Sequence, residues 1–427
     1  MKKILLLSLA LAAFTSCKTK NATDNTPEVF KENLGDNDNA IVETSIGDLE
    51  LPPPYHSESE VLVSNVVGWK DGNKPIAPAG FQVNAFATDL KHPRWTYVHE
   101  NNDIFVVESN TRNSANQISL LRDSNGDGTA DYREVFLSGL NQPFGMLIID
   151  DYFYVANTDG LYRYAYKTGQ EKLTGAGEKI LDLPAGGYNN HWTRNLITNA
   201  DQSKIYISVG SGSNVGENGM EYEVRRATIL EINPDGSGEI EYATGLRNPV
   251  GMDWNPITGE LWTAVNERDK LGNNLVPDYA TSVKKGGWYG WPYSYYGEIN
   301  DPRWRNDPHQ ELVDIAIVPD VPLGSHTASL GFEFYTADQF PATYKNGAFI
   351  GQHGSWNRKP LSGYKVVFIP FDAAGNPQPP QDFLTGFTDP DSEKDVYGRP
   401  VGVTVHNDGS LLVNDDDSGI VWRVSAK

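Results

Sequence analysis

The sequence predicts an all-β fold, a six-bladed β-propeller whose ring is closed by an N-terminal strand. Short runs rich in β-branched and aromatic residues recur along the chain, bounded by Gly, Asn, Asp and Pro. A loose unit of turn, strand, turn and strand recurs at intervals of about 50 to 80 residues. Such intervals hold about four strands each and leave room for insertions, as propeller blades do. The six units start at Pro93, Pro143, His191, Pro249, Leu330 and Pro400.

Ring closure is expected where the two ends of the repeat region meet. The early strand Phe81–Ala87 and the C-terminal strand around Val421–Val424 are expected to share one blade. The alternative fold is an array of β-sandwiches, which would lack a single axis on which the repeats converge.

The composition bounds the size of the fold and the class of partner. The chain has 427 residues, of which 39% are hydrophobic, so residues 60–427 can form one large all-β domain with a substantial core. The formal net charge of −21 argues against nucleic acid and against an anionic membrane surface as partners.

The N-terminus has the features of an export signal. Lys2 and Lys3 precede a short apolar stretch, and Phe14-Thr-Ser-Cys17 resembles a bacterial lipobox, in which the Cys is lipidated. Residues 1–17 are therefore expected to be a lipoprotein signal peptide, and residues 18–59 a flexible acidic tether. We expect an exported protein, periplasmic or on the cell surface, that meets the membrane only through a lipid on Cys17.

One loop has the spacing of a calcium site. In DSNGDGTADYRE, oxygen-bearing residues stand at loop positions 1, 3, 5, 9 and 12, with Gly at position 6 and a carbonyl at position 7. The flanking segments read as strands, so the loop is expected to join a β-hairpin. The predicted ligands are Asp123, Asn125, Asp127, Thr129, Asp131 and Glu134. The alternative is an Asp- and Asn-rich hairpin turn without an ion.

Basic residues recur at the junctions between the repeats of this acidic chain. If the repeats form a ring, these side chains converge on one small polyanion. The residues are Arg94, His191, Arg247, His326, His353, Arg358 and Arg399.

Several strings between Gly80 and Val424 carry a family resemblance. HWTRNL, SVGSGSN, TGLRNPVGMDW, KKGGWYGWPY, GQHGSWNR and GRPVGV…LLVNDDDSGIVWRV resemble the sorbosone and pyranose dehydrogenase family. That family is related to soluble quinoprotein glucose dehydrogenases, which use pyrroloquinoline quinone (PQQ) on a six-bladed propeller. The resemblance implies PQQ as cofactor. This flat tricarboxylate suits the forked arginines and an aromatic surface from Trp192, Trp288, Trp291 or Trp356. The expected cofactor-binding residues are Arg94, Arg247, Asn248, His353, Trp356, Arg358 and Arg399.

The resemblance also implies the catalytic residues. His191 aligns with a histidine that takes the proton of the sugar hydroxyl while a hydride moves to the quinone. Arg247 is expected beside the quinone carbonyl, where it stabilises developing negative charge. The glucose enzymes have an Asp where this chain has Ser211. Ser211 or Asn214 can orient His191 but supplies no charge.

A calcium ion beside the quinone is implied as well. In the glucose enzymes, backbone carbonyls in the matching segment hold this ion, which acts as a Lewis acid. Here the expected ligands are the carbonyls of Arg268 and Asp269, with Asp278 shaping the loop.

The resulting hypothesis is PQQ-dependent oxidation of a sugar or sugar aldehyde, with a periplasmic cytochrome or quinone as electron acceptor. A calcium-dependent propeller hydrolase such as a lactonase is one alternative, although it would converge Glu, Asp and Asn on the ion rather than arginines. The other is a non-catalytic carbohydrate-binding lipoprotein, which the Ser211 departure favours.

Overall fold

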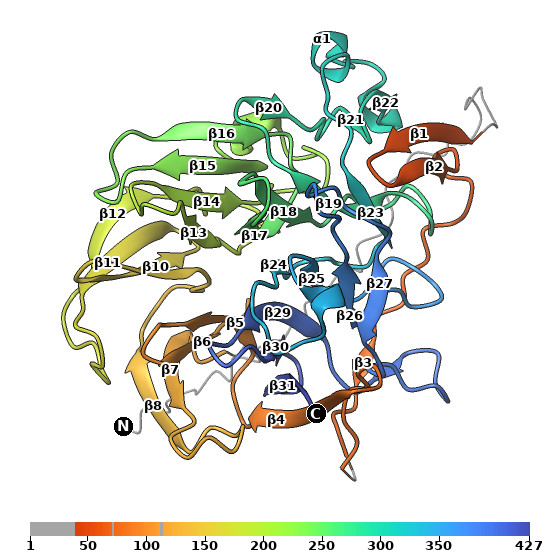
Figure 1. Ribbon diagram of the computed structural model, residues 1–427. Coiled ribbons are helices and arrows are strands. Elements are labelled where there is room, and N and C mark those ends of the chain that lie inside the picture. The colour runs from red at the N-terminus through yellow and green to blue at the C-terminus, as the bar shows by residue number, and fades with distance from the viewer. Residues whose placement is uncertain (1–38, 71, 112–113) are drawn as a thin grey trace, which may run out of the picture. The chain divides into compact units, whose positions relative to one another are not determined.

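A computed structural model describes residues 39–70, 72–111 and 114–427. In this part of the chain, six antiparallel sheets stand around a common axis, which confirms the predicted propeller (Figure 1). The first three blades follow the chain in order. They are β5 (Pro93–Val98), β6 (Ile104–Glu108), β7 (Gln117–Arg122) and β8 (Tyr132–Leu137); β9 (Met146–Ile149), β10 (Tyr152–Asn157), β11 (Gly160–Ala165) and β12 (Glu178–Asp182); and β13 (Leu196–Thr198), β14 (Ile205–Val209), β15 (Thr228–Ile232) and β16 (Ile240–Thr244).

The remaining blades are built in the same way. They are β17 (Pro249–Trp254), β18 (Leu261–Val265), β19 (Pro277–Ser282) and β23 (Val321–Ser325); β24 (Glu333–Phe334), β25 (Ala348–Gln352), β26 (Lys365–Ile369) and β27 (Gln381–Leu384); and β29 (Pro400–Val405), β30 (Leu411–Asp415), β31 (Ile420–Ala426) and β4 (Phe81–Ala87). Each predicted repeat start lies at, or a few residues before, the first strand of a blade.

The ring closes as predicted. β4 pairs antiparallel with β31 and is the fourth strand of the last blade, with Val83 opposite Val424 and Phe81 opposite Ala426. Phe81, Val83 and Val424 are buried in one hydrophobic cluster with residues of blade five. The closing pair is therefore held by side-chain packing as well as by backbone hydrogen bonds.

The inner strands are apolar on both faces because a neighbouring blade covers each face. In β6, Phe105 and Val107 pack in a cluster with Phe153 of the second blade. The alternate residues Ile104 and Val106 pack in a cluster with Leu412 of the last blade. All four β6 side chains are fully buried. The unbroken apolar runs in the sequence thus arise from face-to-face stacking of blades.

A long insertion separates β19 from β23. It contains β20 (Gly287–Trp288), which pairs in parallel with β16, and the short hairpin of β21 (Ser294–Tyr295) and β22 (Ile299–Asn300). A short helix, α1 (Gln310–Val313), follows. Outside the blades, β3 (Asn65–Val66) pairs in parallel with β28 (Asp395–Val396). Among the described residues, no helix has the length and apolar character needed to cross a membrane.

The second half of the predicted tether is structured. β1 (Ala40–Thr44) and β2 (Gly47–Leu51) form a hairpin, in which Val42 and Leu51 are buried against residues of the fourth blade and its insertion. Two backbone hydrogen bonds, from Ser45 to Asp320 and from Tyr55 to Leu271, tie this segment to the propeller. The tether prediction for residues 18–59 is therefore wrong for residues 40–59. Val42 and Leu51 are apolar residues in an otherwise polar, acidic stretch, so they give only a weak sequence signal of a core contact. The rest of the tether, and the signal peptide with Cys17, lie outside the described residues.

Substitution of Val83 by Asp is expected to destabilise the protein by about 3 kcal/mol or more, because it places a carboxylate in the apolar closure seam. Substitution of the neighbouring Gln82, which is exposed on the other face of β4, by Asp is the matched control. Thermal unfolding followed by circular dichroism measures both. Equal melting temperatures for the two variants would show that closure does not depend on this seam.

Candidate active site

The predicted catalytic and cofactor-binding residues gather at one end of the propeller because of the blade geometry. In blades one, four and six, the start of the first strand pairs with the end of the second, as in Pro93 with Glu108 and Pro400 with Asp415. Residues just before the first strand and just after the second strand therefore share an end. Arg247, Asn248 and Arg399 precede first strands, Arg94 lies at the start of β5, and His353 follows β25.

His191 is buried and held by the loop that follows β14. Its Nδ1 lies 2.9 Å from the carbonyl oxygen of Ser211 and 2.9 Å from the Ser211 hydroxyl. The carbonyl can only accept, and the hydroxyl donates its own proton to the Ser213 carbonyl at 2.6 Å. Nδ1 must therefore carry the proton of the neutral ring. Ser211 orients the imidazole through two acceptors, as the sequence suggested it could.

The opposite ring nitrogen is left as a base. Nε2 lies 3.2 Å from Nδ2 of Asn190, which donates to it. Burial lowers the pKa of His191 well below its ordinary value, and the nearby charge of Arg247 lowers it further. The ring is therefore neutral at pH 7, with an unprotonated Nε2.

Arg247 is almost fully buried and is surrounded by backbone carbonyls. Its guanidinium donates to the carbonyls of Asn214, Asn266 and Glu267 and to Oδ1 of Asn214, at 2.6 to 3.1 Å. Asp269 Oδ2 lies 3.4 Å away as a counter-charge. The backbone N–H of Ser211 donates to the Arg247 carbonyl at 2.8 Å, which joins Arg247 to the His191 loop.

Asp269 also holds His326, another of the recurring basic residues. His326 contacts Asp269 Oδ1 through Nδ1 and the Gly272 carbonyl through Nε2. Although burial lowers the pKa of His326, the hydrogen bond and charge of Asp269 outweigh it, and the net shift is upward. Two acceptors on opposite nitrogens suit the doubly protonated ring.

The residues expected to hold the cofactor calcium take structural parts here. The Asp269 carbonyl accepts from Asn214 Nδ2 and Arg303 Nη1. The Arg268 side chain is buried in ion pairs with Glu267 and Asp301. Asp278 accepts three hydrogen bonds, from Glu267, Thr327 and Ser329, and burial raises its pKa to about 7. The structure thus supports Asp278 as a loop-shaping residue, while two donors occupy the Asp269 carbonyl.

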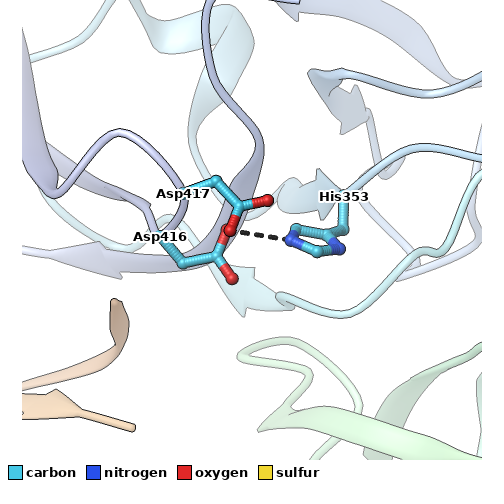
Figure 2. A group of neighbouring side chains, drawn as sticks. All are labelled: His353, Asp416 and Asp417. Atoms are coloured by element: carbon cyan, nitrogen blue, oxygen red, sulfur yellow. Dashed lines mark hydrogen bonds and ion pairs between the residues drawn. The ribbon is translucent and has the colours of Figure 1, made fainter. Parts of the chain in front are cut away.

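A second charged cluster joins three blades. Arg94 Nη1 lies 2.5 Å from Asp416 Oδ2. His353 Nε2 lies 2.8 Å from Asp416 Oδ1 (Figure 2). Arg399 donates to the carbonyls of His353 and Gly354 and lies 3.4 Å from Asp417. His353, Asp416 and Asp417 are the one group of three acidic or His side chains, among the described residues, whose ligand atoms are close enough to hold a metal ion.

The protonation of this cluster follows from its fixed cations. Burial would raise the pKa of Asp416, but the contact with His353 and the charges of Arg94 and Arg399 outweigh it, and the pKa lies well below the ordinary range. Burial and the charge of Arg399 lower the pKa of His353. We conclude that Asp416 is ionised mainly against Arg94, with a neutral His353 donating its Nε2 proton.

The two clusters are connected through Trp192. The Arg94 guanidinium lies over the Trp192 ring, 5.4 Å from its centroid, and Trp192 follows His191 in sequence. Arg94, His353 and Arg399 therefore belong to the same end of the propeller as His191 and Arg247, as the recurrence of basic residues predicted. The arginines are not bare, however, because carboxylates and backbone carbonyls already contact them.

The other predicted cofactor residues differ in exposure. Trp356 is 44% exposed, whereas Trp192 and Trp291 are buried, and Trp291 donates to the Asn214 carbonyl. Arg358 donates to the Asn273 carbonyl. Three buried polar atoms in this set have no hydrogen-bond partner in the described part of the chain: Arg94 Nε, Arg358 Nε and Asn248 Oδ1. Two unsatisfied cationic donors and an acceptor fit a polar, anionic group bound at this end.

The predicted calcium loop does form the turn of a hairpin between β7 and β8, as expected from its flanks. Asp123 accepts from the backbone N–H groups of Gly126, Asp127 and Gly128, and Asp131 accepts from Ser124. Asn125 and Asp127 also bond within the loop, whereas Glu134 lies in β8. Within the described residues, the loop carboxylates do not form a group of three with ligand atoms close together. Calcium at Asp123–Glu134, with Thr129 as a carbonyl ligand, stays a prediction.

The carboxylates of the site were missed from the sequence. Asp416 and Asp417 stand in the run Asp415–Asp417 directly after β30, and Asp269 follows the end of β18 by four residues. Their position after the second strand of a blade is the signal that could have found them, since basic residues at the same end need partners. In a chain with 56 Asp and Glu residues, composition alone does not single them out.

Comparisons with known proteins match this chain to one family model, to related sequences and to solved structures of the same fold. The TrAA12-like family model matches residues 75–293 and 306–427. An uncharacterised protein of Borreliella burgdorferi is 28% identical, over 81% of this chain and 89% of its own length. A pyrroloquinoline quinone-dependent sugar dehydrogenase of Hypocrea jecorina is 20% identical, over 82% of this chain and 88% of its own length. The calcium structure of the Trichoderma reesei carbohydrate-active enzyme of family AA12 superposes with a TM-score of 0.70 at 18% identity, covering 85% of this chain and 98% of that one.

Substitution of Asp416 by Asn is expected to lower the free energy of unfolding at pH 7 by about 3 to 5 kcal/mol, because Arg94 loses its buried partner. A carboxyl whose folded-state pKa is depressed stabilises the protein above its unfolded pKa of about 4 and loses that effect as the pH falls below it. Urea unfolding at pH 7 and pH 3 should therefore show a smaller gap between wild type and variant at pH 3. Asp417→Asn, at a partly exposed site, should change little. A gap that does not depend on pH would contradict this assignment.

Proposed function

Because this chain belongs to the TrAA12-like family, whose relatives include PQQ-dependent sugar dehydrogenases, we propose that it oxidises a sugar or sugar aldehyde with PQQ as its redox cofactor and calcium as its metal. The observation that carries the proposal is His191, a buried neutral imidazole with Nδ1 protonated and Nε2 unprotonated, next to the loop that contacts Arg247. A general base at neutral pH needs this state.

The residues of the chain divide the work. His191 Nε2 takes the proton of the substrate hydroxyl, and Ser211 keeps the other ring nitrogen in place. Arg94, Arg247, Asn248, His353, Trp356, Arg358 and Arg399 would hold the cofactor, with unsatisfied Arg94 Nε, Arg358 Nε and Asn248 Oδ1 as contacts toward it. When bound, the quinone supplies the hydride acceptor and calcium polarises it. Arg247 adds a fixed positive charge that burial in the protein strengthens.

The two alternatives have less support. A calcium-dependent hydrolase would bring carboxylates to an ion, but Asp416, Asp417 and Asp269 each lie against arginine. A non-catalytic sugar-binding protein was suggested by Ser211, yet Ser211 does orient His191 with two acceptor atoms.

In the proposed oxidation, electrons would pass from the reduced cofactor to a periplasmic acceptor, a cytochrome or a quinone.

The direct test is reconstitution of the purified protein with PQQ and calcium, followed by absorbance spectroscopy during addition of aldoses and sugar aldehydes. We expect stoichiometric binding and reduction of the cofactor by at least one sugar. His191→Ala is expected to bind PQQ as the wild type does and to lose turnover at least about 100-fold, because general-base catalysis is removed.

Two outcomes would contradict the proposal. Absence of PQQ binding would exclude the cofactor and leave the hydrolase and sugar-binding alternatives. Binding with unchanged turnover in His191→Ala would exclude His191 as the base. Substitution of His406, which follows β29 at the end of that strand opposite to Arg399, by Ala is the control for loss of a histidine.

We further propose that the protein is exported and anchored by a lipid on Cys17, based on the lipobox-like sequence Phe14–Cys17. Substitution of Cys17 by Ser is expected to move the protein from the membrane fraction to the soluble fraction of the native cells or of a bacterial host. Fractionation with immunoblotting measures this, and mass spectrometry of the N-terminal peptide detects the lipid. Membrane retention of the variant would show another means of attachment.

A further inference from the structure

Glu223 is linked to His191 through hydrogen bonds to a single peptide group that lies between their side chains. It is the residue after a short 3-10 turn (Met220–Tyr222), and it is 6% exposed. One carboxylate oxygen, Oε2, accepts the backbone N–H of Gly212 at 2.6 Å. The other, Oε1, accepts the hydroxyl of Ser213. Both oxygens act as acceptors, which is how an ionised carboxylate binds.

The Gly212 N–H belongs to the same peptide group as the Ser211 carbonyl. That carbonyl accepts the Nδ1 proton of His191 at 2.9 Å. The order of contacts is therefore His191 Nδ1–H, the carbonyl of Ser211, the N–H of Gly212, and the carboxylate of Glu223. A negative charge on the N–H side of a peptide polarises the group and makes its carbonyl a stronger acceptor.

The second oxygen of Glu223 fixes the remaining contact of the histidine. Ser213 donates its hydroxyl to Glu223, and the Ser213 carbonyl accepts the hydroxyl of Ser211 at 2.6 Å. With that proton committed, the Ser211 oxygen can accept from His191 Nδ1. Glu223 thus holds both atoms of Ser211 that orient the ring.

From these contacts we infer that Glu223 is the positioning carboxylate of His191, acting through the peptide between Ser211 and Gly212. The inference rests on the proposed function for its catalytic consequence. In the proposed reaction, His191 Nε2 would take the proton of the substrate hydroxyl, a bound quinone would supply the hydride acceptor, and His191 would become an imidazolium. Glu223 stabilises that cation across the peptide, in place of the absent Asp.

The surrounding charges explain why such a carboxylate matters. Arg247, Arg194 and Arg226 face His191, and the charge of each disfavours its protonation. No ion pair between Glu223 and a Lys or Arg occurs within 4 Å in the described residues. Both carboxylate oxygens are held by the His191 loop, although the charge of Glu223 also acts on Arg226. Glu221, in the same 3-10 turn, is exposed and provides a matched control.

The test compares wild type, Glu223→Gln and Glu221→Gln as full-length protein labelled with ¹⁵N-histidine, without cofactor or substrate. Wild type should show neutral His191 with the proton on Nδ1, assigned by loss of its signals in His191→Gln. In Glu223→Gln the Nδ1 proton signal should move upfield, as its hydrogen bond weakens, while Glu221→Gln matches wild type. A proton on Nε2 in wild type, or an unchanged Nδ1 signal in folded Glu223→Gln, would overturn the inference. If Glu223→Gln fails to fold, the same comparison is made with Glu223→Asp, and a proton on Nε2 in the wild type still overturns the inference.

Kinetics of the PQQ-loaded protein give the second readout. Glu223→Gln should lower kcat about 10- to 100-fold with little change in KM, since the carboxylate acts on the base and not on the substrate. Glu223→Asp should recover part of that loss. A rise in KM with unchanged kcat would also overturn the inference. If the Nδ1 signal moves as expected but no sugar is oxidised by wild type, the proposed function fails while the contact of Glu223 with His191 stands.

Discussion

Stacking of blades on both faces of every inner strand is the constraint on which the rest of this structure depends. A strand covered on both sides leaves little room for a charged side chain along its length, and β6 shows this, with Ile104 to Val107 all buried and its charged residue, Glu108, at its end. Polar residues near the axis are therefore displaced to strand ends, where the backbone turns outward and its carbonyls are exposed. The site is built from those ends. His191, Arg247 and Asp416 come from different blades, yet they lie at one end of the propeller because the start of the first strand and the end of the second strand of a blade are side by side.

Charge at such a place needs compensation, and the chain supplies it with backbone as much as with side chains. Arg247 contacts three carbonyls and one amide oxygen, and Arg399 contacts two carbonyls, so loops that follow the second strands act as ligands of the arginines. The arrangement keeps cations at the axis without a full set of neutralising carboxylates. Burial lowers the pKa of His191 and the charge of Arg247 lowers it further, so an arginine that suits an anionic cofactor also helps to keep the base unprotonated.

The sequence allowed prediction of the repeat starts, the closing strands and the recurring basic residues, because periodic apolar runs and cations stand out in an acidic chain. It did not allow prediction of Asp416 or Glu223, and it named Asp269 only for its backbone carbonyl and not for its carboxylate. Each acts through a contact with a residue far away in sequence, and each is one of many acidic residues. The hairpin of Val42 and Leu51 was missed for a related reason. Two apolar side chains in a polar stretch are a weak local signal, and they become a core contact only when the fourth blade is in place.

The pairing of β4 with β31 has a consequence for how the protein folds during its synthesis. β4 is made before every other blade strand, and its partner is made last, so during translation its hydrogen-bonding edge has no native neighbour. The five blades between them can form as local antiparallel sheets, but the last blade has to wait for the ribosome to finish it. An unpaired strand edge is a site for association with other chains. For a protein of this topology, the interval between synthesis of the first and the last blade strand is the period when a chaperone would be of most use.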